Sequence, residues 1–241
     1  IYDYKSKKNT FYNSNVKTKL TNNYNTNVYN YKKLKYSQNQ LIPSIGSNPD
    51  DGFKIGIVDI YTVYGFERNP FSQQHTINAS YFFANKGFDI AYNAEFANIF
   101  NNWNFLVETQ FTSPNYSVNF YNFGNETLNF ENDFNKNYHR VRISKYVINP
   151  FLKWKGRFGA EFKIGPSIES IEVEDTANRY INAINYQQEK RKTYIGLQAF
   201  YMYENFDNKV FPTLGMNFTL ESGWKQNIEN KLETIALISP S

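Results

Sequence analysis

The segment GFDIAYNAEFANIF, residues 87–100, alternates between two kinds of side chain. One set of alternating positions carries large apolar residues, Phe88, Ile90, Tyr92 and Phe96. The positions between them carry the polar residues Asp89, Asn93 and Glu95. Successive side chains of a β-strand point to opposite faces of a sheet, so this pattern predicts a strand with one apolar face and one polar face. The question is whether the apolar face meets a protein core or lipid.

The same alternation recurs along the chain, separated by turn residues, which predicts an all-β fold of about ten antiparallel strands. The other predicted strands are residues 53–66, 75–86, 101–111, 115–123, 138–148, 157–173, 193–203, 214–224 and 231–238. Their apolar positions add Phe105, Leu214, Met216 and Phe218 to the apolar face. Their polar positions add Glu108, Arg140, Arg142, Glu161, Lys163 and Glu221 to the polar face.

The composition combines many aromatic residues with a low mean hydropathy. Of the 241 residues, 19% are aromatic, and the mean hydropathy is −0.64. A transmembrane β-barrel accounts for both values, because only alternate residues face lipid. No run reaches the roughly 18 apolar residues of a membrane-spanning helix. A soluble β-sandwich is the alternative that composition leaves open.

Strand length favours the membrane barrel over the sandwich. Most of the predicted strands exceed the roughly five to six residues typical of soluble sheets. They match the roughly 9–11 residues that cross a bilayer at barrel tilt. Aromatic residues near the predicted strand ends, including Phe100, Trp103, Trp154 and Trp224, also suit interfacial girdles. We therefore expect a transmembrane β-barrel whose apolar face contacts lipid and whose polar face lines the lumen.

The first part of the chain has a different composition. Residues 1–36 carry eight lysines, Lys5, Lys7, Lys8, Lys17, Lys19, Lys32, Lys33 and Lys35, and one acidic residue, Asp3. Such a segment could contact nucleic acid or anionic head groups. It has neither a helical period nor clustered Arg residues, and we interpret residues 1–42 as an extended connector without a nucleic-acid partner. Residues 43–241 form the predicted barrel.

Three short motifs are similar to those of one known superfamily of barrels. The first is similar to the entry sequence of those barrels and consists of Pro43, Gly46, Asp51, Gly52 and Gly56. The second is similar to their Gly-Phe…Asn-Pro-Phe…His segment and consists of Gly65, Phe66, Asn69, Pro70, Phe71 and His75. The third is similar to a later strand motif and consists of Pro212, Thr213, Gly215 and Phe218. With these motifs the chain resembles the surface-antigen outer-membrane barrel superfamily, the BamA/TamA-like assembly factors. The first residues, IYDYKSKKNTF, look like the connector of versions fused behind a metallophosphoesterase domain.

The resemblance implies a location, partners and a mechanism. Family barrels have sixteen strands, so about ten would be the amino-terminal part of a larger barrel in the outer membrane of a Gram-negative bacterium. The implied function is insertion or export of client proteins, with outer-membrane lipid, clients and complex subunits as partners. A client strand would add at the first barrel strand, where the broken alternation of residues 53–64 suggests the seam. The candidate seam residues are Phe53, Ile55, Ile57, Asp59 and Tyr61.

The sequence offers little for catalysis. The chain has no Cys and two histidines, His75 and His139, and it lacks the ligand spacing of a metal site. Pairing His75 with Ser80, or His139 with Ser144, would give a hydrolase site without an identifiable orienting group. We expect no enzyme activity, metal or cofactor in this chain. The alternative function is a passive pore, or a membrane anchor for a periplasmic metallophosphoesterase domain outside this chain.

Overall fold

The computed structural model describes most of the chain in segments. The described residues are 2–12, 15, 18–22, 36–48, 51–65, 71–100, 103–122, 135, 137–156, 159–174, 177–184, 191–208 and 210–240. The predicted motif residues Phe66, Asn69 and Pro70 lie outside them.

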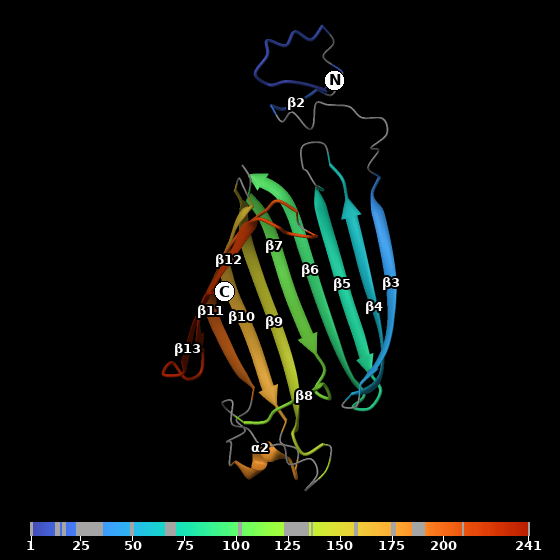
Figure 1. Ribbon diagram of the computed structural model, residues 1–241, viewed down its shortest axis with the longest axis vertical. Coiled ribbons are helices and arrows are strands. Elements are labelled where there is room, and N and C mark those ends of the chain that lie inside the picture. The colour runs from blue at the N-terminus through green and yellow to red at the C-terminus, as the bar shows by residue number, and fades with distance from the viewer. Residues whose placement is uncertain are drawn as a thin grey trace.

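The fold is all-β and consists mainly of one antiparallel sheet (Figure 1). Ten strands follow one another in it: β3 (Gln38–Asn48), β4 (Gly52–Val63), β5 (Gln73–Phe82), β6 (Gly87–Phe100), β7 (Trp103–Thr112), β9 (Arg140–Lys155), β10 (Ala160–Val173), β11 (Lys192–Phe206), β12 (Gly215–Asn227) and β13 (Thr234–Pro240). An eleventh strand, β8 (Ser117–Asn119), pairs with the start of β9. Each strand is antiparallel to its neighbours, which confirms the predicted fold class at this level. The sheet is open, and β3 and β13 are its edges.

The remaining elements are short. The strands β1 (Tyr2–Asp3) and β2 (Lys19–Leu20) form a separate parallel pair, and α2 (Tyr180–Ala183) is a single helical turn. Among the described residues, no helix is both long and apolar enough to cross a membrane.

Local sequence explains the start of β4 and one irregularity in β6. Gly52 adopts φ +66° where β4 begins, a conformation that glycine adopts without a Cβ clash. In β6, the register with β7 shifts between Phe96 and Phe100. Asn98 has φ +48° there, and its backbone N–H donates to Asn104 Oδ1 at 2.9 Å. This bulge ends the regular alternation of the segment that predicts the strand.

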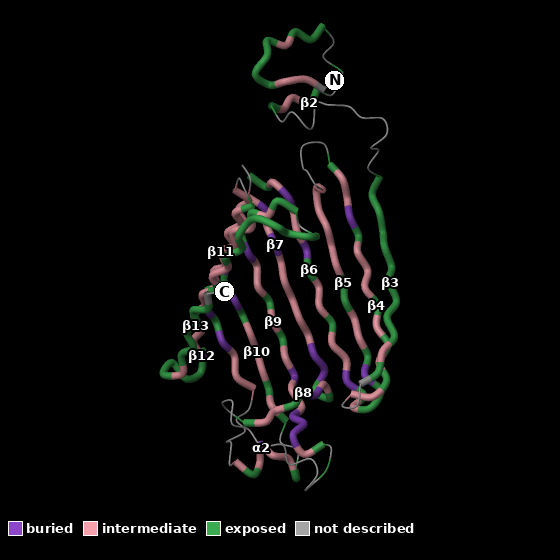
Figure 2. The backbone as a smooth tube through the Cα atoms, viewed as in Figure 1, coloured by how far each residue is buried: buried purple, intermediate pink, exposed green. Residues whose placement is uncertain are grey.

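Fully buried side chains are few (Figure 2). Several of them gather at the end of the sheet where β8 pairs with β9: Thr112, Ser113, Ser117, His139, Arg140 and Val141. His139 lies against the rings of Tyr121 and Tyr180, with centroids 4.6 and 4.9 Å away. Along most of their length the strands are half-buried or exposed, so the described residues form a single layer rather than two packed layers.

Candidate functional site

The sheet gathers most of the predicted polar residues on one face, which we call the polar face. The ladders pair Asn93 with Glu108, and Glu161 with Lys155. They also pair Lys163 with Lys153 and with Phe200, which in turn pairs with Glu221. Paired residues share a face. The register therefore unites Asp89, Asn93, Glu95, Glu108, Glu161, Lys163 and Glu221.

Arg140 and Arg142 do not join this row. The register gives them the same parity as Ser144 and Tyr146, opposite to that of Lys153. Both lie near the start of β9, where Arg140 pairs with Asp51 and Arg142 with Glu174. The alternation in residues 138–148 places Arg140 and Arg142 on the wrong face. From Lys145 to Lys155 the apolar side chains of β9 are at even positions, as at Ile148 and Leu152, so the two even-numbered arginines share the parity of the apolar face.

Ion pairs on the polar face connect β6 with β9, across the intervening β7, and β9 with β10. Glu95 Oε2 lies 3.2 Å from Lys153 Nζ, and Glu95 Oε1 lies 3.5 Å from Lys155 Nζ. The Asn104 amide also donates to Glu95. Lys153 in turn lies 3.8 Å from Glu161. The predicted polar-face residues Glu95 and Glu161 therefore pair with Lys153 and Lys155, which the sequence alternation did not assign to that face.

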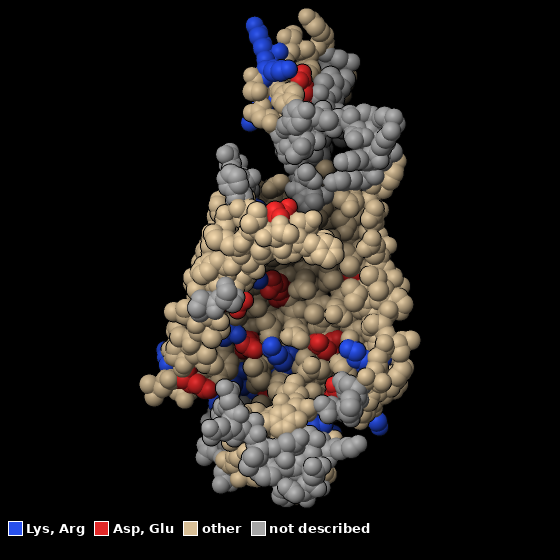
Figure 3. All heavy atoms as spheres, viewed as in Figure 1, with Lys and Arg blue, Asp and Glu red and all other residues tan. Residues whose placement is uncertain are grey.

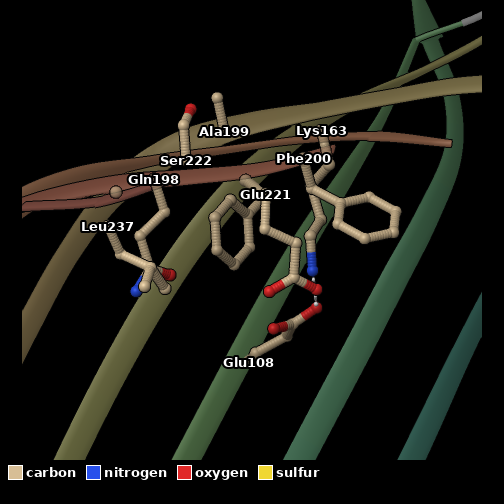
Figure 4. A pocket seen from close by; sticks show the side chains of 10 residues that line it. Glu108, Lys163, Gln198, Ala199, Phe200, Glu221, Ser222 and Leu237 are labelled. Atoms are coloured by element: carbon tan, nitrogen blue, oxygen red, sulfur yellow. Dashed lines mark hydrogen bonds and ion pairs between the residues drawn. The ribbon is translucent and has the colours of Figure 1, made fainter. Parts of the chain in front are cut away.

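A second cluster surrounds Lys163 (Figure 4). Its Nζ binds Glu108 Oε1 at 2.9 Å and lies over the ring of Phe151, 4.4 Å from the centroid. Glu221 extends toward this pair from β12. Phe200 also stacks near the lysine, at 5.7 Å. A lysine held between two aromatic rings and a carboxylate is a fixed positive charge rather than a mobile surface group.

Glu169 forms the third cluster, which the sequence analysis misses. Its side chain is 13% exposed and lies 3.6 Å from Lys145 Nζ, and it also pairs with Lys225. The alternation in residues 157–173 places Glu169 in register with Glu161 and Lys163. This shared alternation with Glu161 and Lys163 is the signal that could have identified Glu169 as a polar-face residue.

These clusters line a hollow (Figure 3). A space of about 440 Å³ is lined by residues of β6, β7, β9, β10, β11 and β12, among them Asn93, Glu108, Lys145, Glu169 and Lys225. A neighbouring space is lined by residues from Glu108 on β7 to Leu237 on β13. Strands so far apart in the sheet can line one space only if the sheet curves with its polar face inside. The arrangement can hold water and polar solutes.

The opposite face, which we call the apolar face, is exposed. It carries the predicted residues Phe88, Ile90, Phe96, Phe105, Met216 and Phe218, and Leu214 lies directly before β12. Its exposed side chains extend over the whole sheet: Ile45, Ile55, Ile57, Tyr61, Ile77, Tyr81, Ile90, Tyr146, Ile148, Leu152, Ile168, Ile195, Leu197, Met216, Phe218, Trp224 and Ile238. Monomeric soluble proteins rarely expose apolar patches larger than a few hundred Å².

Charged residues are scarce on the apolar face. In the described strands they lie near one end, at Arg140, Arg142 and Glu172, with the exception of Asp59. The Oδ1 atom of Asp59 is buried and has no hydrogen-bond partner among the described residues. Two of the predicted girdle residues, Trp103 and Trp154, pair with each other, and Phe100 lies 6.2 Å from Trp103 between ring centroids.

The free edge of the sheet differs from the predicted seam. Phe53, Ile55, Ile57, Asp59 and Tyr61 lie on β4, which pairs with β3 on one side and β5 on the other. The edge strand is β3, so residues 38–42 belong to the sheet rather than to the connector. Pro43 and Pro49 are residue types typical of turns, which is why the predicted connector ends at residue 42. Proline is tolerated in an edge strand, where its missing N–H can face away from the ladder.

The two histidines have structural partners. His75 Nδ1 lies 2.8 Å from the Tyr92 hydroxyl on the apolar face, whereas Ser80 belongs to the polar face. His139 Nδ1 lies 3.2 Å from the Phe120 carbonyl oxygen, and the hydroxyl of Ser144 accepts from Arg191. Neither histidine is brought to its candidate serine. Within the described segments, no group of three or more His, Cys, Asp or Glu side chains could hold a metal ion.

Comparison of the chain with protein-family models, with curated proteins and with solved structures gives no match.

Proposed function

We propose that this chain is part of a β-barrel in the bacterial outer membrane, with the apolar face against lipid and the polar face around an aqueous lumen. The observation that carries the proposal is the division of one curved sheet into an exposed apolar face and a charged hollow. Lipid solvates the apolar face, and water solvates the polar face.

The main alternative, a soluble sandwich, requires a second layer on the apolar face. The described residues supply no such layer, since the sheet and the single turn α2 account for nearly all regular structure. The long strands also favour lipid. β6, β9 and β11 have 14, 16 and 15 residues, against the roughly 9–11 that cross a bilayer.

Open sheet edges favour a larger assembly. In hydrocarbon, each unpaired backbone group is costly, and closure of the sheet removes that cost. The row of ten strands and the resemblance to sixteen-stranded surface-antigen barrels support the proposal that this sheet is the amino-terminal part of a larger barrel.

The activity that we propose is assembly or translocation of other outer-membrane proteins, by addition of a client strand at the first strand of the barrel. Its support is the free edge of β3, which no described strand covers, together with the sequence resemblance. Unpaired ladder groups are a template for β-augmentation. The proposal assigns no catalysis or cofactor to this chain.

A passive pore is the second candidate, because the hollow is polar and lined by charges of both signs. In that case the barrel would also serve as an anchor for a periplasmic metallophosphoesterase domain.

One reconstitution experiment tests both candidates. The protein is folded into lipid vesicles, and the folding rate of an added, urea-denatured outer-membrane barrel is compared with its rate in protein-free vesicles; conductance is measured in a planar bilayer. Faster client folding with little current supports assembly. A large constitutive current without faster folding supports the pore, and failure to enter lipid contradicts both.

A further inference from the structure

The apolar face changes in character toward the end of the sheet where β8 and α2 lie (Figure 1). Three successive rows of side chains cross β9, β10 and β11 there. The first row is apolar and exposed, and consists of Ile148, Ile168 and Ile195. The second row consists of Tyr146, Ser170 and Thr193. The third row consists of Ser144, Glu172 and Arg191, which directly precedes β11.

These rows pass from apolar to charged within a short distance. Each row lies two residues beyond the last, so the isoleucines and the charged row are about 13 Å apart along the strands. A lipid bilayer passes from hydrocarbon to head groups over a similar depth. The third row therefore lies where head groups would meet the sheet if the isoleucines contact acyl chains.

Arg191 is held in a fixed orientation at this end. Its Nη2 donates to Glu172 Oε2 at 2.7 Å and to Ser144 Oγ at 3.0 Å. Its guanidinium lies over the ring of Tyr146, 4.8 Å from the centroid. The side chain is still 34% exposed, and a guanidinium has five N–H donors. Donors of Arg191 therefore remain for a further ligand.

Arg142 lies one step further toward the same end, with the parity of Ser144. Its Nη1 lies 3.2 Å from Glu174 Oε2, and both side chains are partly exposed. In the described part of the chain, the side-chain hydrogen bonds of Arg142 use Nη1 alone. Most of its guanidinium donors are thus open to a ligand.

Arg179 brings a third guanidinium to this group. It donates to the carbonyl oxygen of Asn137, which also accepts from the backbone N–H of Arg140 at 3.1 Å. Burial lowers the pKa of Arg179, and the positive charges of Arg142 and Arg140 lower it further. Like charges therefore lie close together at this end of the sheet.

The carboxylates nearby do not balance these charges. Arg140 pairs with Asp51. The other three arginines have only Glu172 and Glu174 as carboxylate partners among the described residues. One positive charge remains, and an anion bound between the guanidinium groups would balance it.

The two ends of these strands differ. The aligned row near the opposite end is aromatic, and consists of Trp154, Phe162 and Tyr201. The longest connections between neighbouring strands, from β7 to β9 and from β10 to β11, lie at the arginine end. In outer-membrane barrels the longer connections face the outside and the short turns face the periplasm. The arginines would therefore meet the outer leaflet.

We propose that Arg142, Arg179 and Arg191 bind the phosphate groups of a phosphate-bearing lipid in the outer leaflet, whose acyl chains lie against the aligned isoleucines. Guanidinium groups match phosphate oxygens with two parallel hydrogen bonds, which selects phosphate over uncharged head groups. This inference rests on the proposed membrane location, but it involves neither a client protein nor an edge of the sheet.

Lipid binding to the full chain in uncharged detergent tests the site, measured by native mass spectrometry. The probes are lipid A, which carries phosphate groups, and diacylglycerol, which carries none. We expect lipid A to bind and diacylglycerol not to displace it. The double variant Arg142→Gln/Arg191→Gln should weaken lipid A binding roughly tenfold or more, because charge-assisted hydrogen bonds are lost.

A matched double variant separates ligand binding from structural support. Glu172→Gln/Glu174→Gln breaks the same two ion pairs but keeps the arginines, so it should bind lipid A at least as tightly as the unmodified chain. Lys155→Gln removes a positive charge from the polar face and should leave lipid A binding unchanged. Circular dichroism in the same micelles checks that each variant retains its β-sheet.

Three results would overturn the inference. The first is unchanged lipid A binding in Arg142→Gln/Arg191→Gln, and the second is equal weakening in both double variants. The third is binding of inorganic phosphate as tight as that of lipid A, which would identify free phosphate rather than lipid as the ligand. Entry into vesicles of phosphatidylcholine tests the membrane location separately, so failure of lipid A binding alone rejects only this site.

Discussion

Lys163 on β10 reaches across β9 to Glu108 on β7, with 2.9 Å between Nζ and Oε1. The pair passes over Phe151 on the intervening strand. Neighbouring strands lie about 4.8 Å apart, so this pair spans about 10 Å of the polar face, a distance that two long side chains bridge together. The charges of the hollow thus link strands that do not pair directly, and they also define its polarity.

Loss of Glu169 should destabilise the sheet, because two lysines depend on this half-buried carboxylate. We expect Glu169→Gln to lower the free energy of unfolding by about 1–2 kcal/mol, since Lys145 and Lys225 lose their counter-charge. Denaturant unfolding in detergent measures it. The control is Glu172→Gln on the same strand, whose more exposed pair with Arg191 should contribute less. Equal effects would contradict the assigned role of Glu169.

Gly165 allows close approach of β9 and β10. A Cβ at this position would overlap the carbonyl oxygen of Pro150 and crowd Phe151. Gly165→Ala is expected to cost about 1–3 kcal/mol of unfolding free energy, because backbone must move. Gly223→Ala is the matched control, since its Cβ would make ordinary contacts at 3.7 Å or more. A neutral Gly165→Ala variant would show that the two strands are farther apart.

The hairpin between β12 and β13 should open in acid. Glu233 accepts hydrogen bonds from Tyr194 and Asn227 and pairs with Lys192, and these contacts lower the pKa of its carboxyl from the ordinary value of a glutamate. A lowered pKa in the folded state gives stability that is present above the unfolded pKa and is lost as pH falls through the folded value.

We therefore expect protease cleavage within residues 228–232 to increase as pH falls below about 4.5. An acid-active protease measures the cleavage rate. The Glu233→Gln variant should be cleaved readily at all pH values and lose this pH dependence, whereas the Glu229→Gln variant should retain it. Equal pH dependence in all three proteins would rule out Glu233 as the titrating group.

A matched pair of arginine substitutions tests the two faces. Ile148 is exposed on the apolar face, whereas Val147 borders the hollow. If the apolar face meets lipid, Ile148→Arg should reduce stability in vesicles by about 2–4 kcal/mol, and Val147→Arg should cost much less. Urea titration of the vesicle-folded protein measures both. A neutral Ile148→Arg, as expected for an exposed residue in water, would argue against lipid contact.

Alternation predicts the strands well where both faces are distinct. Residues 87–100 form β6 with the predicted bounds, and the predicted strand at 193–203 lies within β11. The predicted strand at 115–123 is reduced to Ser117–Asn119 among the described residues. β9 continues past the predicted end, because Pro150 is accommodated in the ladder opposite Val107. Prolines inside strands thus account for two of the errors in strand bounds, at Pro150 in β9 and at Pro43 in β3.

The polar clusters are harder to predict, because they depend on register between strands that are distant in the sequence. Parity places Glu108 and Lys163 on a common face. It does not indicate that they are two strands apart and in contact, since this depends on the order and register of the strands in the sheet. Lys145 interrupts the apparent apolar side of residues 138–148, and the structure explains it as a partner of Glu169.

The contact of the apolar face with hydrocarbon is tested most directly by tryptophan quenching. Trp224 is 46% exposed on this face, and Trp103 and Trp154 lie on it near one end of their ladder. Protein is mixed with vesicles of lipids brominated along the acyl chains and with unbrominated vesicles. We predict strong loss of emission in the brominated vesicles, and the same loss in a variant that carries Phe at positions 103 and 154, where Trp224 is the sole tryptophan. Unchanged emission, with the protein monodisperse in buffer without detergent, would contradict the account.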